Sequence, residues 1–367
     1  MSAYRRILVL MDNRLDSNWG SRATTNALFN LLRQSHPEAE IRGVPRSAAR
    51  PRRALARRIC EAVAPEAALA GNWRGWLRSR VLRWLTEKMR SDLEWADLVI
   101  VNGEGTLHPQ KQCMRWMPVI AALPMFTKAP LWVVNCTIQV CGSKWEDLWK
   151  TALAMAERIV VREPASFREV QRLGLHVEQG ADCAFAANFI APEKAQEIIK
   201  SRGISKPFAV LTGGALADGW PTAPQRAILS MLKDQGLEVV YVTSTQEDSA
   251  NYERVGMDCK LITEKDADYP EIMGIIREAS QLIGGRFHPI VFAVCGGTPF
   301  VCFSSNTHKM AGLLEMLGTQ YRLLDIADTR NLWKAIETAL GAGDGERRAM
   351  ETLSRRLADM ARLNAAR

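Results

Sequence analysis

Residues 280–318 read SQLIGGRFHPIVFAVCGGTPFVCFSSNTHKMAGLLEMLG and hold two short apolar runs separated by a helical pattern. The runs are LIGG at 282–285 and FVCF at 300–303, and neither alternates polar with apolar residues. Continuous apolar runs of this length are typical of strands buried on both faces, as in parallel sheets. The stretch therefore predicts a strand–helix–strand–helix unit of an α/β sheet.

The same alternation extends along most of the chain. Apolar runs of strand length occur at 6–11, 97–102, 131–135, 158–161, 208–212 and 237–242, and helical patterns occur at 21–33, 144–156 and 165–173. Near residue 190 a helix, a glycine turn and a new first strand indicate the start of a second series. We therefore predict two Rossmann-like doubly wound domains, at 1–190 and 191–345, and a charged amphipathic helix at 346–367.

Composition narrows the class of protein. The chain has 367 residues, which is enough for two hydrophobic cores at about 150 residues per domain. Hydrophobic residues make up 47% and charged residues 24%, which argues against a disordered or fibrous chain.

The opening MSAYRRILVLMDN indicates a strand and not a secretory signal, and no apolar stretch reaches the ~18 residues of a membrane span. The eight cysteines are dispersed without a C-x-x-C pair, so we expect reduced thiols in a cytoplasmic protein and no metal site.

The positive charge is concentrated in one segment. Residues 42–90 hold thirteen Arg or Lys against three Glu, whereas the whole chain is only +8. Within it, NWRGWLRSRVLRWLTEKMR at 72–90 predicts a helix with Trp and Leu on one stripe and arginines largely elsewhere. Two interpretations stay open. The helix binds an anionic membrane surface, which would place the protein peripherally at the inner membrane, or its apolar stripe packs on the core. We expect no nucleic-acid partner, because no base-reading module is visible.

A candidate anion site follows the strand at 282–285. Gly284 and Gly285 let backbone approach a ligand closely, and Arg286 supplies a rigid guanidinium at the start of the next helix. His288 lies two residues further on and titrates near neutral pH. The residues predict a site for a phosphate or carboxylate beside a proton donor or acceptor. The alternative is a surface arginine followed by a histidine that caps the helix.

Several motifs together resemble the polysaccharide pyruvyltransferase family. The resemblance rests on the Arg286-Phe287-His288 block with its following Gly-x-Pro strand, and on ERIVVREPASFREVQRLG at 157–174. It extends to GADCAFAAN at 180–188, the Gly-rich loop in ADLVIVNGEGTLH at 96–108, and the Asn-x-Gly loop after the first strand. In two of these loops the chain departs from the family pattern, with Ser21 after the Asn-x-Gly and Glu104 interrupting the glycine run.

The resemblance implies a GT-B-like fold and transfer of pyruvate from phosphoenolpyruvate to a sugar hydroxyl, with a cyclic ketal and free phosphate as products. The acceptor would be a bacterial cell-surface glycan or its lipid-linked precursor, bound by the first domain, and the second domain would bind phosphoenolpyruvate. No cofactor or metal is implied, because cationic side chains can neutralise the donor's charge.

The resemblance and the local chemistry together give a set of candidate residues. His288 is the expected general acid or base, and Glu104 is expected to orient or deprotonate the acceptor, unless it is a solvated loop carboxylate. The expected donor-binding residues are Arg162, Arg286, Lys309, Gly285 and His308, and the expected acceptor contacts are Asp16 and Asn18. The last two are equally typical of a turn and a helix cap.

Two other functions remain open on the sequence alone. A GT-B glycosyltransferase that uses a nucleotide sugar shares this architecture, and architecture does not decide chemistry. The altered loops around Ser21 and Glu104 are also compatible with a non-catalytic relative that binds a glycan.

Overall fold

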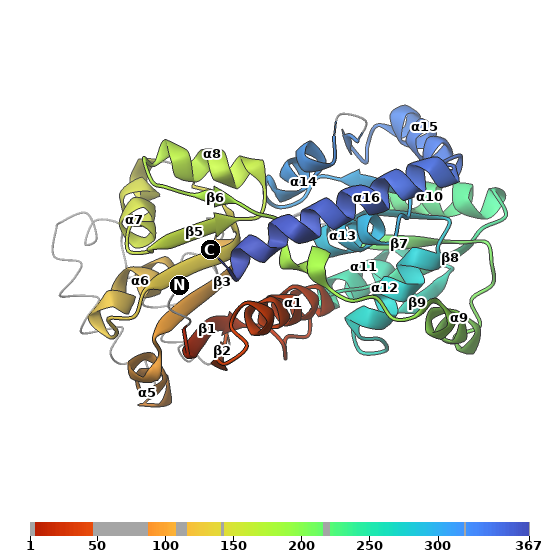
Figure 1. The fold of residues 1–367 in the computed structure, drawn as a ribbon. Coiled ribbons are helices and arrows are strands. Elements are labelled where there is room, and N and C mark those ends of the chain that lie inside the picture. The colour runs from red at the N-terminus through yellow and green to blue at the C-terminus, as the bar shows by residue number, and fades with distance from the viewer. Residues whose placement is uncertain are drawn as a thin grey trace. The chain divides into compact units, whose positions relative to one another are not determined.

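The structure is a computed structural model that describes residues 4–46, 87–107, 116–140, 143–215, 221–318 and 321–366 (Figure 1). The basic helical insertion predicted at 42–90 lies outside the described residues, except at 42–46 and 87–90. Within the described ranges, none of the helices combines the length and the apolar character that crossing a membrane requires.

The chain divides into two compact units that are not simple halves of the sequence. Unit 1 consists of Met1–Leu15, Leu28–Asp182 and Ala361–Arg367, and unit 2 consists of Asp16–Ala27 and Cys183–Met360. The change of unit that the sequence analysis placed near 190 therefore lies at Asp182–Cys183. A short segment after the first strand also belongs to unit 2, and the end of the chain returns to unit 1.

Among its described residues, unit 1 holds a parallel sheet in the order β2-β1-β3-β4-β5-β6. Its strands are β1 (Arg6–Asp12), β2 (Glu40–Pro45), β3 (Leu98–Leu107), β4 (Leu131–Ile138), β5 (Arg158–Val161) and β6 (Glu178–Gln179). Its helices are the later part of α1 (Trp19–Ser35), α5 (Glu87–Trp95), α6 (Trp116–Ala122), η1 (Leu123–Met125), α7 (Ser143–Leu153), α8 (Pro164–Arg172) and η3 (Arg362–Asn364).

Unit 2 repeats this plan in the order β12-β11-β10-β7-β8-β9, again with parallel pairing throughout the described strands. Its strands are β7 (Phe208–Gly214), β8 (Glu238–Val242), β9 (Lys260–Ile262), β10 (Gln281–Gly285), β11 (Phe300–Phe303) and β12 (Leu323–Leu324). Its helices are η2 (Cys183–Ala186), α9 (Pro192–Ser201), α10 (Thr222–Asp234), α11 (Gln246–Val255), α12 (Tyr269–Glu278), α13 (Phe287–Cys295), α14 (Lys309–Leu317), α15 (Thr329–Leu340) and most of α16 (Asp344–Ala361).

The central strands are buried on both faces, as the continuous apolar runs predict. All eight residues of β4 and all five residues of β10 are buried. Figure 1 shows helices flanking the sheet within each unit. The predicted doubly wound α/β architecture is therefore confirmed.

The residues around Trp19 belong to the core of unit 2, although they follow the first strand of unit 1 in sequence. The Trp19 indole is fully buried, stacks on Phe292 with ring centroids 5.5 Å apart, and donates its Nε1–H to the Thr243 carbonyl over 2.7 Å. An aromatic pair with a satisfied N–H is a strong anchor, because both its apolar body and its polar edge are used. The segment is thus held in unit 2 by side-chain packing.

We predict that Trp19→Ala lowers the free energy of unfolding by about 3–5 kcal/mol, the usual cost of deleting a buried aromatic side chain. Trp19→Phe keeps an aromatic ring beside Phe292 but removes the N–H that binds the Thr243 carbonyl, so a smaller loss of about 1–2 kcal/mol is expected. Urea unfolding of the full chain measures both values. A loss below about 1 kcal/mol for Trp19→Ala would show that the segment is not part of this core.

Candidate active site

Each sheet has one position where the order of its strands reverses, and ligands of open α/β sheets bind outside the carboxyl ends of the strands at that position. In unit 2 the chain builds outward from β7 to β8 and β9, and then continues on the other side with β10, β11 and β12. The reversal lies between β7 and β10, where Gly214 pairs with Gly285. Gly285, which we expected beside the donor, lies at this reversal and is buried.

Two further glycines at this edge are required by close packing. A Cβ atom on Gly284 would lie 1.8 Å from the Thr212 hydroxyl oxygen, and one on Gly213 would lie 2.2 Å from an Asp248 carboxylate oxygen. Real Cβ atoms do not approach other atoms this closely, so a larger residue at either position would have to displace the Thr212 or Asp248 side chain. The glycines therefore bring the polar groups of β7, β10 and α11 together.

Arg286 follows β10 directly and occupies the N-cap position of α13. Its Nε donates to Asp248 Oδ1 over 2.9 Å, and its Nη2 lies 2.7 Å from the same oxygen and 3.0 Å from Thr245 Oγ1. The Asp248 side chain is only 2% exposed, whereas that of Arg286 is 16% exposed. The guanidinium is thus fixed along its Nε–Nη2 edge, and these contacts do not use Nη1.

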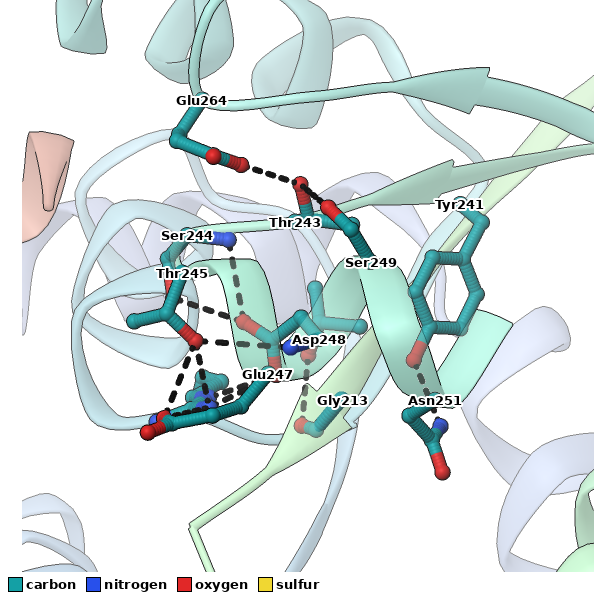
Figure 2. Close-up of polar contacts among 12 residues, drawn as sticks. Gly213, Tyr241, Thr243, Ser244, Thr245, Glu247, Asp248, Ser249, Asn251 and Glu264 are labelled. Atoms are coloured by element: carbon teal, nitrogen blue, oxygen red, sulfur yellow. Dashed lines mark hydrogen bonds and ion pairs between the residues drawn. The ribbon is translucent and has the colours of Figure 1, made fainter. Parts of the chain in front are cut away.

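Asp248 is the residue that organises this edge, and the sequence analysis did not identify it. Its second oxygen, Oδ2, accepts hydrogen bonds of 3.0 Å from both the backbone N–H and the hydroxyl of Ser244. Figure 2 shows the carboxylate between Ser244 and Gly213. A signal was present, because Thr245 and Asp248 form a T-x-x-D helix-start motif after the β8 strand, and Thr245 caps α11.

Tyr241 and Asn251 lie beside this group in the same unit (Figure 2). The Asn251 amide donates to the Tyr241 hydroxyl oxygen over 3.0 Å. Burial, reinforced by the nearby Asp248 carboxylate, raises the pKa of Tyr241 well above its ordinary value. The phenol therefore stays neutral at physiological pH and adds no charge to the edge.

His288 lies in the first turn of α13 and is half-buried. Its ring lies against Gly20, where a Cβ atom would come within 2.4 Å of Nδ1. Gly20 belongs to the Asn-x-Gly loop, and its N–H donates to the Asn18 side-chain oxygen over 2.9 Å. The two most distant motifs of the sequence, Asn18-Trp19-Gly20 and Arg286-Phe287-His288, thus meet within unit 2.

Asp16 and Asn18 were expected to contact the acceptor in the first domain, but the structure places both in unit 2. Their side chains shape the entry to α1. The Asp16 carboxylate accepts the Asn18 N–H over 3.0 Å, and Asn18 in turn caps Gly20 and Ser21. The turn-and-cap interpretation accounts for these contacts.

Lys309 and His308 lie at the start of α14, after β11, and both are half-buried. The Lys309 ammonium donates to the Asn306 side-chain oxygen over 2.8 Å, and His308 is the N-cap residue without a side-chain capping bond. Because β11 is the neighbour of β10, this segment emerges from the same edge of the sheet as Arg286.

In unit 1 the strand order reverses between β1 and β3, and Glu104 lies at that position. Its side chain is 3% exposed, so the alternative of a solvated loop carboxylate is wrong. The Asn13 side-chain amide, just after β1, donates to Glu104 Oε1 over 2.7 Å. Glu104 adopts a left-handed backbone with φ of 42°, which non-glycine residues adopt at a cost.

Arg162, which we expected to bind the donor, lies in the interior of unit 1 with a side chain that is 1% exposed. Its Nη1 donates to Asp182 over 2.5 Å and its Nε to the Thr137 hydroxyl over 2.9 Å. The Thr137 hydroxyl also donates to Glu163, which pairs with Ser166. The family-like residues of this region therefore form one buried network that ties β4, β5 and α8 together.

Comparison with known proteins gives the family. The sequence profile described as polysaccharide pyruvyl transferase matches residues 18–307, which is more than half of the chain. The protein belongs to the polysaccharide pyruvyl transferase family. It is therefore a transferase of the pyruvyltransferase kind, with a role in polysaccharide biosynthesis. No curated protein matches this family member in sequence.

Solved structures similar to this pyruvyltransferase relative show its fold. S. aureus MnaA in complex with UDP aligns with a TM-score of 0.61 at 12% identity, over 96% of this chain and 94% of that one. A UDP-GlcNAc 2-epimerase from Methanocaldococcus jannaschii, in complex with UDP-GlcNAc and UDP, aligns with a TM-score of 0.57 at 11% identity, over 96% and 99%. The spinosyn rhamnosyltransferase SpnG with thymidine diphosphate gives 0.51 at 12% identity, over 98% and 97%. The family member thus has an α/β two-domain GT-B-like fold, as expected.

We predict that Asp248→Asn destabilises the transferase by about 2–3 kcal/mol, because it removes the buried negative charge that pairs with Arg286. Glu247→Gln is the matched control. Glu247 lies 3.9 Å from the same guanidinium, but its side chain is 88% exposed. Its loss should cost about 0.5 kcal/mol or less, since exposed ion pairs contribute little. Equal effects of the two changes in urea unfolding would contradict the central role of Asp248.

Proposed function

We propose that the enzyme transfers pyruvate from phosphoenolpyruvate to two hydroxyls of one sugar, forming a cyclic ketal and releasing phosphate. The observation that carries the proposal is the Gly-Gly-Arg-x-His segment at the strand reversal of unit 2, in a chain that belongs to the pyruvyl transferase family. An arginine, a histidine and the N-terminus of α13 lie together there, as recognition and protonation of a small anion require.

On the donor side, phosphoenolpyruvate carries a phosphate and a carboxylate and calls for several cationic groups. Arg286 is anchored through its Nε–Nη2 edge by Asp248, so Nη1 is the nitrogen that we assign to the donor. Lys309 adds a second positive charge from the neighbouring strand, with His308 and Gly285 lining the same edge. No cofactor or metal enters the proposal, because these cations can neutralise the donor's charge.

In the proposed reaction, protonation of the donor's methylene carbon creates an oxocarbenium-like centre at the adjacent carbon. One sugar oxygen bonds to that centre, and the carbon–oxygen bond to phosphate breaks as the second sugar oxygen closes the ring. Of the two hydroxyl protons, one ends on the new methyl group and the other on phosphate. We assign proton transfer to His288, and the orientation or deprotonation of the acceptor to Glu104.

In the proposal Arg162 has a structural role in place of the donor-binding role expected from the sequence. Its guanidinium is buried and ion-paired to Asp182, so we assign it to holding the carboxyl ends of β4 and β5 in place. Truncation of a buried ion pair leaves an uncompensated charge. Loss of Arg162 is therefore expected to act through the shape of unit 1, and not through a direct contact with phosphate.

We further propose that the acceptor is a bacterial cell-surface glycan or its lipid-linked precursor, used in the cytoplasm. Binding of the 42–90 segment to the inner membrane would bring the enzyme to such a precursor, and its thirteen Arg or Lys support this proposal through their charge.

The proposal predicts phosphate release from phosphoenolpyruvate in the presence of a suitable member of a panel of p-nitrophenyl hexosides. Arg286→Ala and His288→Ala should each lower this release by about 100-fold or more, since each removes a group that acts in the transition state. His176→Ala is the control, because His176 is an exposed histidine away from either strand reversal. Wild-type rates in His288→Ala would overturn the proposed mechanism.

Ligand-dependent thermal stability separates the proposed donor from that of a glycosyltransferase. Phosphoenolpyruvate at about 100 times its Kd should stabilise the protein by about 2.7 kcal/mol, and Arg286→Ala should abolish that shift. UDP or thymidine diphosphate, the ligands of the structural neighbours, should leave the melting temperature unchanged. Stabilisation by a nucleotide diphosphate alone would favour the glycosyltransferase. Phosphoenolpyruvate binding without turnover on any hexoside would favour a non-catalytic relative.

A further inference from the structure

A chain of buried amide side chains in unit 1 connects the C-terminal segment to Glu104. We propose that Asn364 is a positioning residue, which acts through Asn135 and Asn102 to hold the Glu104 carboxylate in its working orientation. The inference rests on the acceptor-side role proposed for Glu104. It also connects the C-terminal segment to the acceptor-side step that we assign to Glu104.

The first link joins Asn364 to the second half of β4. Asn364 is fully buried, and its Oδ1 accepts the backbone N–H of Asn135 over 2.7 Å. Its Nδ2 donates over 2.9 Å to each of two carbonyls, those of Ala181 and Ala361. One amide thus fixes three backbone groups, two of them far from it in sequence. Because Asp lacks the donor and Leu lacks both functions, only an amide fits here.

The second link runs from Asn135 to the carboxylate. Asn135 Nδ2 donates to Asn102 Oδ1 over 2.9 Å, and Asn102 Nδ2 lies 3.4 Å from Glu104 Oε1. Asn102 and Asn135 are both fully buried. Asn135 donates through its backbone N–H to Asn364 and through its side chain to Asn102, and the Asn102 amide in turn donates toward the Glu104 carboxylate, where this chain of bonds ends at an acceptor.

The backbone shows that these contacts surround two residues with positive φ, a conformation that non-glycine residues seldom adopt. Asn135 has φ of 54° and Glu104 has φ of 42°, and they lie in the second halves of the neighbouring strands β4 and β3. Such conformations cost on the order of 1–3 kcal/mol each and persist where the surroundings fix them. The hydrogen bond from the Asn135 N–H to Asn364 holds the first of these conformations directly.

Glu104 is held from a second direction by Asn13. The Asn13 amide donates to Oε1 over 2.7 Å, the same oxygen that faces Asn102. Two donors, one in β3 and one just after β1, thus restrain the position of this oxygen. Its orientation therefore depends on both sides of the strand reversal, and loss of the Asn102 side would remove one of the two donors to Oε1.

The C-terminal segment has other contacts that supply a control. The His36 ring lies 3.1 Å from the Ala365 carbonyl oxygen, and Arg158 Nη1 donates to the Ala366 carbonyl over 2.5 Å. These contacts hold the same segment but do not belong to the amide chain. His36→Ala therefore loosens the segment and leaves the chain from Asn364 to Glu104 intact.

The experiment compares Asn364→Ala, Asn135→Gly and His36→Ala in the full-length protein. Asn135→Gly keeps the left-handed backbone and the N–H that binds Asn364, but deletes the amide that reaches Asn102. For the first two variants we expect phosphate release with the active hexoside to fall about 10- to 100-fold in kcat, while phosphoenolpyruvate binding by calorimetry stays unchanged. His36→Ala should keep its turnover.

A second readout needs no acceptor. In protein labelled with 15N at asparagine, Glu104→Gln identifies the side-chain amide signals of Asn13 and Asn102 by shifting them. Asn364→Ala should shift the same signals, whereas His36→Ala should not. A structural role of the C-terminal segment alone would move them equally in both variants.

The outcomes separate the two hypotheses. Wild-type kcat in Asn364→Ala, or unmoved Asn13 and Asn102 signals, overturns the positioning role even if Glu104→Gln is inactive. Full activity of Glu104→Gln overturns the role of Glu104 in the proposed function. The amide chain would then have no effect on catalysis through Glu104. If the wild type turns over no hexoside, the asparagine signals decide whether Asn364 positions Glu104.

Discussion

The central strands of both sheets are buried on both faces, so the polar groups of the candidate site gather toward the carboxyl ends of the strands. All residues of β4 and β10 are buried, and the polar groups of the candidate site include Asn135 in the second half of β4 and Arg286 directly after β10. In a parallel sheet all the carboxyl ends lie along one edge, so polar groups from distant parts of the sequence are crowded together there. These polar groups are expected to hydrogen-bond with one another, because burying a polar group without a partner lowers the stability of the fold. The candidate site is a consequence of this constraint.

The two units meet the constraint with different chemistry. In unit 2 the edge is organised by charge, because the buried Asp248 carboxylate fixes Arg286 and glycines allow the strand ends to approach. In unit 1 the strand reversal is organised by neutral amides around the Glu104 carboxylate. A charged edge suits a small anionic donor, and amides beside a carboxylate suit the hydroxyls of a neutral sugar. This division of chemistry agrees with the donor and acceptor roles that we propose for the two units.

Charged residues that look alike in sequence have different places in the structure. Arg162 and Arg286 each follow a strand directly, yet the first has a side chain that is 1% exposed and the second one that is 16% exposed. Arg162 forms ion pairs with Glu163, at the start of α8, and with Asp182. Both partners belong to unit 1, so the charge of Arg162 is neutralised within that unit. Arg286 meets Asp248 along one edge only. Partner geometry therefore separates a structural arginine from a ligand-binding candidate, and sequence position does not.

The sequence by itself determined the α/β class, the central strands and the Arg-x-His segment, because long apolar runs and glycine–cation clusters are local signals. It did not reveal the edge strands: β6, β9 and β12 have only two or three residues, and β2 is interrupted by Arg42 and partly exposed, so none carries a continuous apolar run. Only the tertiary structure decided that Asp16–Ala27 joins unit 2, that Asp248 anchors Arg286, and that Asn364 reaches Asn135. These contacts join residues far apart along the chain, and one polar side chain at a strand end looks much like another until packing selects its partner.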